Sequence, residues 1–369
     1  MRYRIIKGYF VKEILELIRT KMILMPFFIP FLIVVLFGYG IKMQVTDVRV
    51  HIIDNDKTNL SNTLISKFEH SKYFNTSVEN ISEAQALKKI KQASKDVIII
   101  IPSSFEKNIL KNVKSEVGIF IDASFPSRAT TITNYIQGVV LSLASELNLQ
   151  GSNSITLNNR NLFNQALRDE EMIVPGLLGL VLLVSPAILT ALLVAKEKEK
   201  GTIFNFYSSS VTKVEFVIAK LSAVFTLASL NIFLLFLLVI YLFDLPFRGS
   251  FLLYILSSEI YIFISLSIGF VISILVSSQI VAVIVTLLMT ILPGFLYSGM
   301  LMPISSMGSE AYIIAHIYPV MYYNHIIYDV FLIGQGFDSF KIVFYLGLLI
   351  AYAIGFFILS ILLLKKEIR

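Results

Sequence analysis

The stretch ALLVAKEKEKGTIFNFYSSS, Ala191–Ser210, joins an apolar run to five consecutive charged residues, a Gly-Thr pair and a group of aromatic residues. Each Lys at the centre of a membrane-spanning helix costs roughly 2.5–3.5 kcal/mol on insertion scales, so KEKEK must lie beyond the membrane surface. Gly201 is suited to the left-handed conformation that ends a helix. The stretch therefore predicts a point where one spanning helix leaves the membrane before the next begins.

The whole chain has the composition of a membrane protein. Of its 369 residues, 56% are hydrophobic and 15% are charged, and the mean hydropathy is +0.77, far above that of a soluble domain. The absence of cysteine excludes disulfides, thiolate metal sites and cysteine nucleophiles. The net charge of +6 includes no basic block interleaved with aromatic residues, so we expect no nucleic-acid partner.

Segments of about 20 apolar residues are long enough to cross a bilayer core of about 30 Å as helices. The segments that reach this length are 22–41, 172–195, 216–243, 251–276, 280–301 and 340–364. The first is too long for a signal-peptide core and no small-residue cleavage site follows it, so we expect it to be retained. The predicted fold class is a membrane protein with an all-α transmembrane domain of six helices and an extracytoplasmic α/β domain inserted between helices 1 and 2.

The distribution of Lys and Arg predicts the orientation of these spans. Residues 1–21, 196–215 and 365–369 hold six, four and three basic residues, whereas the opposite short loops hold little more than Arg248 and Lys341. Because basic residues accumulate in short cytoplasmic loops, both termini and the 196–215 segment are expected in the cytoplasm. The predicted location is the inner (cytoplasmic) membrane, crossed several times, with residues 365–369 as a cytoplasmic tail.

Residues 1–21 have the pattern of an amphipathic helix lying in the membrane interface. One face carries apolar residues, and basic residues lie opposite: Ile6, Phe10, Ile14, Leu17 and Ile18 form the apolar face. This pattern favours an interfacial cytoplasmic helix. An ordinary extension of the first span is the alternative.

Residues 43–171 are predicted to form the extracytoplasmic α/β domain. Strand-like runs of β-branched residues occur at Asp47–Asp54, Asp96–Ile101 and Glu116–Asp122. Capping-box spacings, Ser82 with Gln85 and Ser103 with Glu106, predict helices between the strands. An amphipathic helix over 127–149 and the Asn-rich linker 151–161 complete the segment.

Acidic residues at the ends of these strands admit two interpretations. Asp54, Asp56 and Asp122 supply oxygen atoms that suit a cation. Aspartate is also a common turn residue after a strand, and we favour that interpretation. The sequence therefore predicts no metal site.

The 196–215 segment shows two helix-start signals after Gly201. Thr202 is placed to cap a short helix, and Thr212 with Glu215 has capping-box spacing at the start of the next span. The short helix would expose Phe204, Phe206 and Tyr207. Ordinary helix termination explains the lysines and Gly201, whereas an exposed aromatic patch beside acidic residues suggests a docking surface.

These residues carry a family resemblance. AKEKEKGTIFNFYSSSVTKVEFVIAK resembles the E-K-E-x-G-T segment, with its following acid and Gly/Ala-Lys pair, of ABC type 2 exporter permeases. LYSGMLMPISSM and IYPVMYYNHIIYDVFLIGQG are similar to the outer segment of that family before its last span. One span, a large outer domain and five further spans also match, so the resemblance covers the whole chain.

The resemblance implies that 196–215 is a cytoplasmic coupling segment resting on a separate ATPase. The positions that match the ATPase-coupling contact are Glu197, Glu199, Gly201, Thr202, Phe206 and Glu215, and Lys220 matches the Lys that follows. Phe204 replaces an acid and Ser210 a proline, departures compatible with a dedicated rather than a shared ATPase. These roles follow from the resemblance alone.

The chain itself has no G-x-x-x-x-G-K-[ST] motif and no hydrolytic constellation around its four histidines. We therefore expect a permease subunit that is not an enzyme and holds no cofactor, with ATP and Mg supplied through cytoplasmic ABC ATPase subunits. The other expected partners are a second permease copy, the same or similar, the lipid bilayer, and periplasmic or outer-membrane efflux components.

Polar residues within spans are the candidates for a translocation pathway. Glu259 is the acid farthest inside an apolar run, where it would attract a cationic amphiphile or a proton, unless the span begins later and places it at the outer interface. Asn231, Thr286 and Thr290 are further candidates, although hydrogen bonding between helices also explains them.

The segment 302–339 is predicted to re-enter the membrane from outside as two short helices. Pro293 and Gly294 interrupt the fifth span, and Pro303 and Pro319 begin turns in the returning segment, so these four residues are the outer-gate candidates. The tyrosines and histidines of this segment are interpreted as an interfacial belt rather than a metal site.

The predicted function is ATP-driven export of hydrophobic or amphiphilic, drug-like compounds. Six spans are too few to enclose a large cavity, which is why two copies are expected. Export of a polymer, a lipid or Na⁺ is the alternative within transport. A membrane sensor with an extracytoplasmic ligand-binding domain is the alternative of another class.

Overall fold

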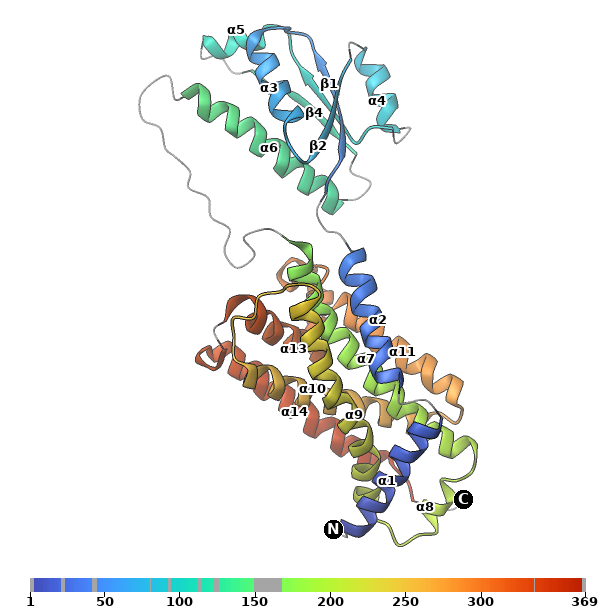
Figure 1. The fold of residues 1–369 in the computed structure, drawn as a ribbon. Helices are drawn as coiled ribbons and strands as arrows, with labels where there is room; N and C mark the ends of the chain where they lie inside the picture. The colour runs from blue at the N-terminus through green and yellow to red at the C-terminus, as the bar shows by residue number, and fades with distance from the viewer. Residues whose placement is uncertain are drawn as a thin grey trace. The chain divides into compact units, whose positions relative to one another are not determined.

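A computed structural model describes most of the chain as two compact units (Figure 1). The described residues are 3–20, 24–41, 45–79, 81–91, 94–111, 115–122, 126–148, 168–334 and 336–366. The predicted linker 151–161, residues 1, 2 and 21 of the N-terminal segment, residues 22 and 23 of the first span and the tail beyond Lys366 lie outside them. One unit, here the helical unit, combines Met1–Ile41 with Arg160–Arg369, and the α/β unit is Lys42–Asn159.

The helical unit contains long apolar helices and several short connecting ones. Its α-helices are α1 (Tyr3–Arg19), α2 (Met25–Gly40), α7 (Asp169–Glu199), α8 (Phe204–Tyr207), α9 (Lys213–Tyr241), α10 (Phe251–Leu275), α11 (Gln279–Leu296), α12 (Ser309–Ile317), α13 (Pro319–Tyr328) and α14 (Phe340–Leu363). Short 3-10 helices lie at Ile304–Ser306 and Gly336–Asp338, and a single π-helical turn lies at Asp329–Ile333.

Among the described residues, five helices are long and apolar enough to cross a membrane: α7, α9, α10, α11 and α14. Helix α2 is apolar but has 16 residues, fewer than the roughly 20 that a span requires. Helix α7 extends beyond the predicted 172–195 at both ends, and α11 ends at Leu296 instead of continuing to residue 301. Pro293 lies inside α11, so the predicted interruption of the fifth span at Pro293 and Gly294 is wrong.

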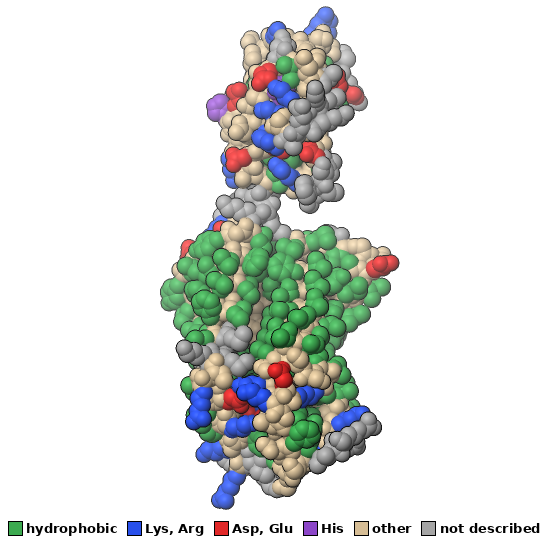
Figure 2. Space-filling model, turned by 90° about the vertical axis from the view of Figure 1, so that its right-hand side faces the viewer, with side chains coloured by type: hydrophobic (Ala, Val, Ile, Leu, Met, Phe, Trp, Pro, Cys, Tyr) green, Lys and Arg blue, Asp and Glu red, His purple; other side chains and the backbone are tan. Residues whose placement is uncertain are grey.

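Helix α7 occupies the centre of the helical unit. It contacts α2, α9, α10, α11 and α13, and its most apolar stretch is wholly buried among them. By contrast, most of α11 and α14 is at least partly exposed, with large apolar side chains such as Leu292 and Ile354 on the surface. Figure 2 shows the resulting band of hydrophobic side chains, with Lys, Arg, Asp and Glu gathered at the end of the unit below it. This distribution suits a helical bundle surrounded by lipid.

The α/β unit is built around a four-stranded sheet. The elements follow in the order β1 (Val48–Asp54), α3 (Asn59–Glu69), β2 (Phe74–Val78), α4 (Glu83–Lys91), β3 (Val97–Ile101), α5 (Phe105–Leu110), β4 (Gly118–Ile121) and α6 (Pro126–Asn148). The strand order is β2-β1-β3-β4, with β1 parallel to both neighbours and β4 antiparallel to β3. Strand β2 was not predicted, because FNTSV is short and polar.

The two crossover helices cover opposite faces of the sheet (Figure 1). The chain moves from β1 outward to β2 through α3 and then back past β1 to β3 through α4, so crossovers of one hand place the helices on opposite sides. Val50 and Ile52 accordingly pack into a core with α3, α5 and α6, whereas Ile53 packs with Ala86 of α4. The alternation of β1 side chains follows from the pleat of the strand.

Turn and cap residues of this unit test the predicted helix starts. The capping box of Ser82 and Gln85 is confirmed by its two reciprocal hydrogen bonds. The box predicted for Ser103 and Glu106 is wrong: the backbone N–H groups of Phe105 and Glu106 donate to Asp56, both at 3.0 Å. Asp56 is therefore a helix cap supplied from a distant loop.

Asp54 has the turn role that the sequence favoured. Its Oδ1 accepts hydrogen bonds from the N–H groups of Asp56 and Lys57, at 2.9 and 3.1 Å. Its Oδ2 accepts from the hydroxyl of Ser61 in the first turn of α3. These bonds hold the turn that connects β1 to α3.

Candidate functional site

The charged end of the helical unit is organised by three helices that are distant in sequence. Helix α1 packs on α9, and the end of α7 lies beside both. Because Glu13 and Leu17 are one turn apart, they share the buried face of α1, and both are fully buried. Of the apolar residues predicted to face the membrane, Leu17 is buried inside the protein, whereas Ile18 is 51% exposed.

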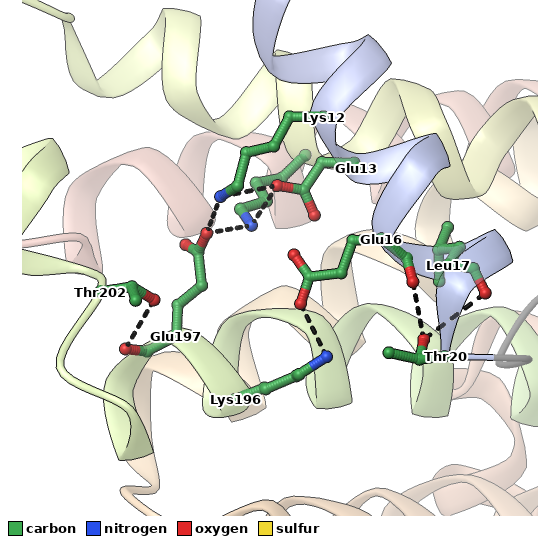
Figure 3. Close-up of polar contacts among 9 residues, drawn as sticks. Lys12, Glu13, Glu16, Leu17, Thr20, Lys196, Glu197 and Thr202 are labelled. Carbon is green, nitrogen blue, oxygen red and sulfur yellow. Dashed lines mark hydrogen bonds and ion pairs between the residues drawn. The ribbon is translucent and has the colours of Figure 1, made fainter.

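A network of ion pairs fills the space between these helices (Figure 3). The Lys220 ammonium of α9 lies 2.6 Å from Glu13 Oε1 of α1 and 2.9 Å from Glu197 Oε1 of α7. Lys12 pairs with Glu197 and also lies 3.4 Å from Glu13 Oε1. The side chains of Lys220, Glu13 and Glu197 are 1%, 0% and 7% exposed. We call these four residues the ion-pair network.

The charges in the ion-pair network are balanced, because two ammonium groups face two carboxylates. Buried charges are tolerated only when they are paired, and removal of one partner typically costs about 3–5 kcal/mol. The pairing is nevertheless incomplete, since Glu13 Oε2 is buried without a hydrogen-bond partner among the described residues. The ring of Phe216 also lies 5.7 Å from the Lys220 ammonium and adds a cation–π contact.

A further ion pair links α1 to α7 beside the network. Lys196 Nζ lies 2.7 Å from Glu16 Oε1. Partial burial raises the pKa of the Glu16 carboxyl, but the hydrogen bond and charge of Lys196 outweigh this effect and hold the pKa below its ordinary value. Burial has the opposite effect on the Lys12 ammonium and lowers its pKa. The hydrogen bond and charge of Glu197 outweigh burial, so the pKa of Lys12 lies above its ordinary value. Both shifts favour the charged forms that hold α1 in place.

The segment 196–215 folds back onto the helices and buries one of its aromatic side chains. Phe206 is 2% exposed and stacks on Phe216 of α9, with ring centroids 4.1 Å apart. The prediction that Phe206 is exposed is therefore wrong, whereas Phe204 is 55% exposed as predicted. Lys366 braces the same segment, because its ammonium donates to the carbonyls of Ser209 and Val211 at 2.7 and 2.6 Å.

The helix ends around this segment follow two of the three sequence signals. Gly201 has a φ of +72°, the left-handed conformation predicted for the end of α7. The capping box of Thr212 and Glu215 at the start of α9 is confirmed. Thr202 does not cap α8; its hydroxyl donates to the Glu197 carbonyl, at 3.4 Å, and so helps to close α7.

The last turn of α7 also holds the connection between α10 and α11. The Lys198 ammonium donates to the carbonyl of Val276 at 3.0 Å and to that of Ile274. Glu199 Oε2 accepts from the N–H of Gln279, the first residue of α11, at 2.8 Å. A carboxylate at a helix N-terminus is favoured by the helix dipole, so Glu199 acts as a cap for α11. The two predicted acids therefore face different elements, Glu197 toward α1 and α9, and Glu199 toward α11.

The predicted pathway residues do not converge on one site. The Glu259 carboxylate accepts a hydrogen bond from Ser229 at 2.7 Å and faces a groove beside α14. Thr286 and Thr290 are fully buried and donate to carbonyls of their own helix. Asn231 is 4% exposed within α9. Asn231, Thr286 and Thr290 are therefore buried among the helices, whereas Glu259 borders a groove on the surface.

The predicted outer-gate residues lie in separate surroundings. Gly294 packs closely on Leu180 of α7, Pro319 begins α13, and Pro303 lines a cavity of about 440 Å³. The segment 302–339 contains two short α-helices, α12 and α13. Helix α13 packs on α7 and α14. Asn324 of α13, which was not singled out from the sequence, is fully buried and donates to the carbonyls of Gly176 and Ser298.

Two central members of the ion-pair network were not recognised from the sequence. They are Glu13 and Lys12, which lie in the N-terminal segment 1–21, where the basic residues predict contact with the membrane surface. The usable signal was the position of Glu13, three residues after Phe10 and four before Leu17, which places an acid on the apolar face of a helix. In the sequence, Lys220 is marked only by its match to the family pattern.

Comparison with known proteins gives consistent results over nearly the whole chain. The family profile described as "ABC-2 family transporter protein" matches residues 21–362. The probable multidrug ABC transporter permease YbhS of Escherichia coli (strain K12) is 26% identical over 341 residues, which cover 91% of this chain and 90% of that protein. The probable multidrug ABC transporter permease YbhR of the same organism is 26% identical over 332 residues, covering 89% of each.

More distant similarity extends to two further proteins. The inner membrane transport permease YhhJ of Escherichia coli (strain K12) is 23% identical over 331 residues, covering 86% of this chain and 85% of that protein. ABC transporter G family member 20 of Dictyostelium discoideum is 21% identical over 344 residues, which cover 88% of this chain but 46% of that protein.

Proposed function

The chain belongs to the ABC-2 family of transporter proteins, and from this membership we propose that it is the membrane-spanning permease subunit of an ATP-driven exporter. Permeases of ABC transporters work with ATPase subunits. The proposed energy source is a separate ABC ATPase that binds ATP and Mg and docks on the charged end of the helical unit. The proposed cargo is a hydrophobic or amphiphilic, drug-like compound moved out of the cell, in line with the multidrug names of two relatives.

The ion-pair network is the observation that carries the coupling proposal. It ties the end of the central helix α7 to α1 and α9, while Glu199 and Lys198 tie the same turn to the α10–α11 connection. A force applied at the exposed Phe204 beside this turn would act on several helices together, because buried ion pairs resist separation. ATPase closure would thus reach the spans through α7.

We further propose a topology that fits this coupling site. The charged end lies on the cytoplasmic side of the inner membrane, and α2 joins the five long apolar helices as a sixth span. The α/β unit then lies outside the cytoplasm, where periplasmic or outer-membrane efflux components would meet it. A second copy of the chain pairs with the first to form the pathway, because α11 and α14 leave wide apolar faces uncovered.

The coupling proposal is tested by co-expression with the candidate ATPase. Phe204→Ala removes exposed docking surface, so we expect reduced co-purification of the ATPase. Glu199→Ala removes the cap of α11 but little docking surface, so we expect the complex to assemble while substrate efflux per ATP hydrolysed falls several-fold. Assembly is measured by pull-down and coupling by transport in proteoliposomes.

Val214→Ala is the matched control. Val214 is the second residue of α9, and its side chain, like that of Phe204, is apolar and partly exposed. It should leave both assembly and coupling unchanged. If Phe204→Ala and Glu199→Ala behave like Val214→Ala, the coupling assignment is wrong. If no ATPase binds the wild-type chain at all, the proposed exporter subunit is itself contradicted.

A further inference from the structure

An apolar groove on the surface of the helical unit runs between α9, α10 and α14. It consists of two adjoining hollows of about 330 and 340 Å³, which share the side chains of Phe225, Phe263 and Phe357. Ile218 and Leu221 line one hollow, and Ile354 lines the other. Volumes of this size accommodate drug-sized molecules.

A single charged side chain lines the groove. Glu259 enters the first hollow, and the lining of the two hollows within the described residues contains no Lys, Arg or His. Its contact to Ser229 supplies one neutral hydrogen bond to Oε2 and no opposite charge. An acid at this depth, about 12 Å along α10 from Phe251 at 1.5 Å per residue, is costly without a counter-ion.

The groove is polarised along its length. Glu259 lies at the hollow beside α14, whereas the second hollow extends along α9 toward Ile218 and Leu221, the part of α9 that also carries Lys220. The three phenylalanines lie between these ends. A ligand that fills the groove would therefore meet a carboxylate at one end, aromatic rings in the middle and aliphatic side chains at the other end.

We propose that this groove binds a lipophilic organic cation, with Glu259 as its counter-ion and the three phenylalanines as its aromatic wall. Aromatic rings attract cations through their quadrupoles, most strongly where water is excluded, and the carboxylate adds charge complementarity. A lipid acyl chain would occupy the apolar surface but would leave Glu259 uncompensated. The inference deepens the proposed function by naming the class of substrate.

The test is equilibrium binding to the purified full-length permease, without any ATPase, in nanodiscs whose lipids carry no net charge. Tetraphenylphosphonium is the probe, and tetraphenylborate, of similar size and opposite charge, is its comparison. We expect saturable binding of tetraphenylphosphonium and weak binding of tetraphenylborate. Glu259→Gln should lower the affinity for tetraphenylphosphonium by at least about tenfold and remove the preference for the positively charged probe. Glu259→Asp should retain this preference.

Glu310→Gln is the matched control, because Glu310 is an exposed acid on α12 outside the groove. It should leave the affinity for tetraphenylphosphonium unchanged. Phe263→Leu should weaken the binding of tetraphenylphosphonium without strengthening the binding of tetraphenylborate. Equal binding of the two probes, unchanged affinity in Glu259→Gln or no binding to the wild type overturns the proposal. Because the assay omits the ATPase, failure of transport with intact cation binding would contradict the exporter function and leave this site standing.

Discussion

At Lys220 one ammonium group lies between two carboxylates from helices more than twenty residues away along the chain. Lys220 is 1% exposed, so its charge is stabilised by Glu13 and Glu197 rather than by water. A shorter or uncharged side chain would leave two buried carboxylates facing each other with only Lys12 between them. Lys220 therefore joins α9 to both α1 and α7.

Lys220→Met should strongly destabilise the helical unit. Loss of one member of a buried charged group typically costs about 3–5 kcal/mol, since the remaining charges stay desolvated. Removal of a second charge in Glu13→Gln/Lys220→Met should recover part of the loss, and a double-mutant cycle measures that coupling. The readout is the thermal denaturation midpoint of the full chain in detergent.

Lys200→Met is the control for this substitution, because Lys200 is exposed at the end of α7. Its midpoint should stay close to that of the wild type. Equal small effects of Lys200→Met and Lys220→Met would show that the ion-pair network contributes little to stability.

Helix α10 approaches the central helix α7 closely because one residue has no side chain. A Cβ atom added at Gly269 would lie 2.1 Å from the carbonyl oxygen of Ala187, whose backbone cannot move without separating the helices. Small residues at such crossings allow backbones to pack directly against each other. The buried position of α7 thus depends on what α10 lacks as well as on hydrophobicity.

Gly269→Ala should destabilise the contact between α10 and α7 by about 1–3 kcal/mol, the usual cost of overpacking. Gly347→Ala in α14 is the matched control, since a Cβ at Gly347 would meet no described atom within 4 Å beyond the backbone of its own helix. That variant should be neutral or slightly stabilised, because alanine favours the helix. Thermal midpoints in detergent compare the two, and similar midpoints would contradict the close packing at Gly269.

At the scale of the whole molecule, each unit has a hydrophobic core of its own. In the α/β unit, Asp96 links β1 to β3 through a two-point contact with Arg49, whose Nη2 and Nε lie 2.8 and 3.1 Å from its two carboxylate oxygens. Arg128 of α6 lies 3.4 Å from the same carboxylate. This contact belongs entirely to the α/β unit, so we expect its loss to act there.

Asp96→Asn should raise the hydrogen exchange of β1 and β3 and leave α7 and α10 protected. The loss of a charge-assisted bond to a buried carboxylate is worth about 1–3 kcal/mol. Glu69→Gln, at the exposed end of α3, is the control and should change neither unit. Faster exchange in both units would show that their stabilities are coupled.

The effect of Asp96 should also depend on pH. Burial raises the pKa of the Asp96 carboxyl, but the bonds from Arg49 outweigh burial and lower it below its ordinary value of 3.8. The stabilisation is therefore complete above that value and is lost as the pH falls through the lower pKa of the folded protein. The difference in stability between wild type and Asp96→Asn should shrink accordingly below about pH 4.

Much of the local structure was readable from the sequence because it depends on neighbouring residues. The left-handed Gly201 and the capping boxes of Ser82 and Thr212 all involve groups within a few positions of each other. The start of α5 was not readable, because its cap is Asp56 from a distant loop. Phe206 was misplaced for the same reason: its stacking partner, Phe216, lies across a turn that local pattern does not specify.

The sequence by itself determined that this is a multi-pass membrane protein of the ABC-2 family, because long apolar runs and the E-K-E-x-G-T segment are properties of contiguous residues. Only the tertiary structure decided which charges meet. Glu13 and Lys220 are about two hundred positions apart, and Glu259 faces a groove formed by three separate helices. Hydrophobicity is nearly additive along the chain, whereas the pairing of buried charges depends on which helices pack together and how each is rotated.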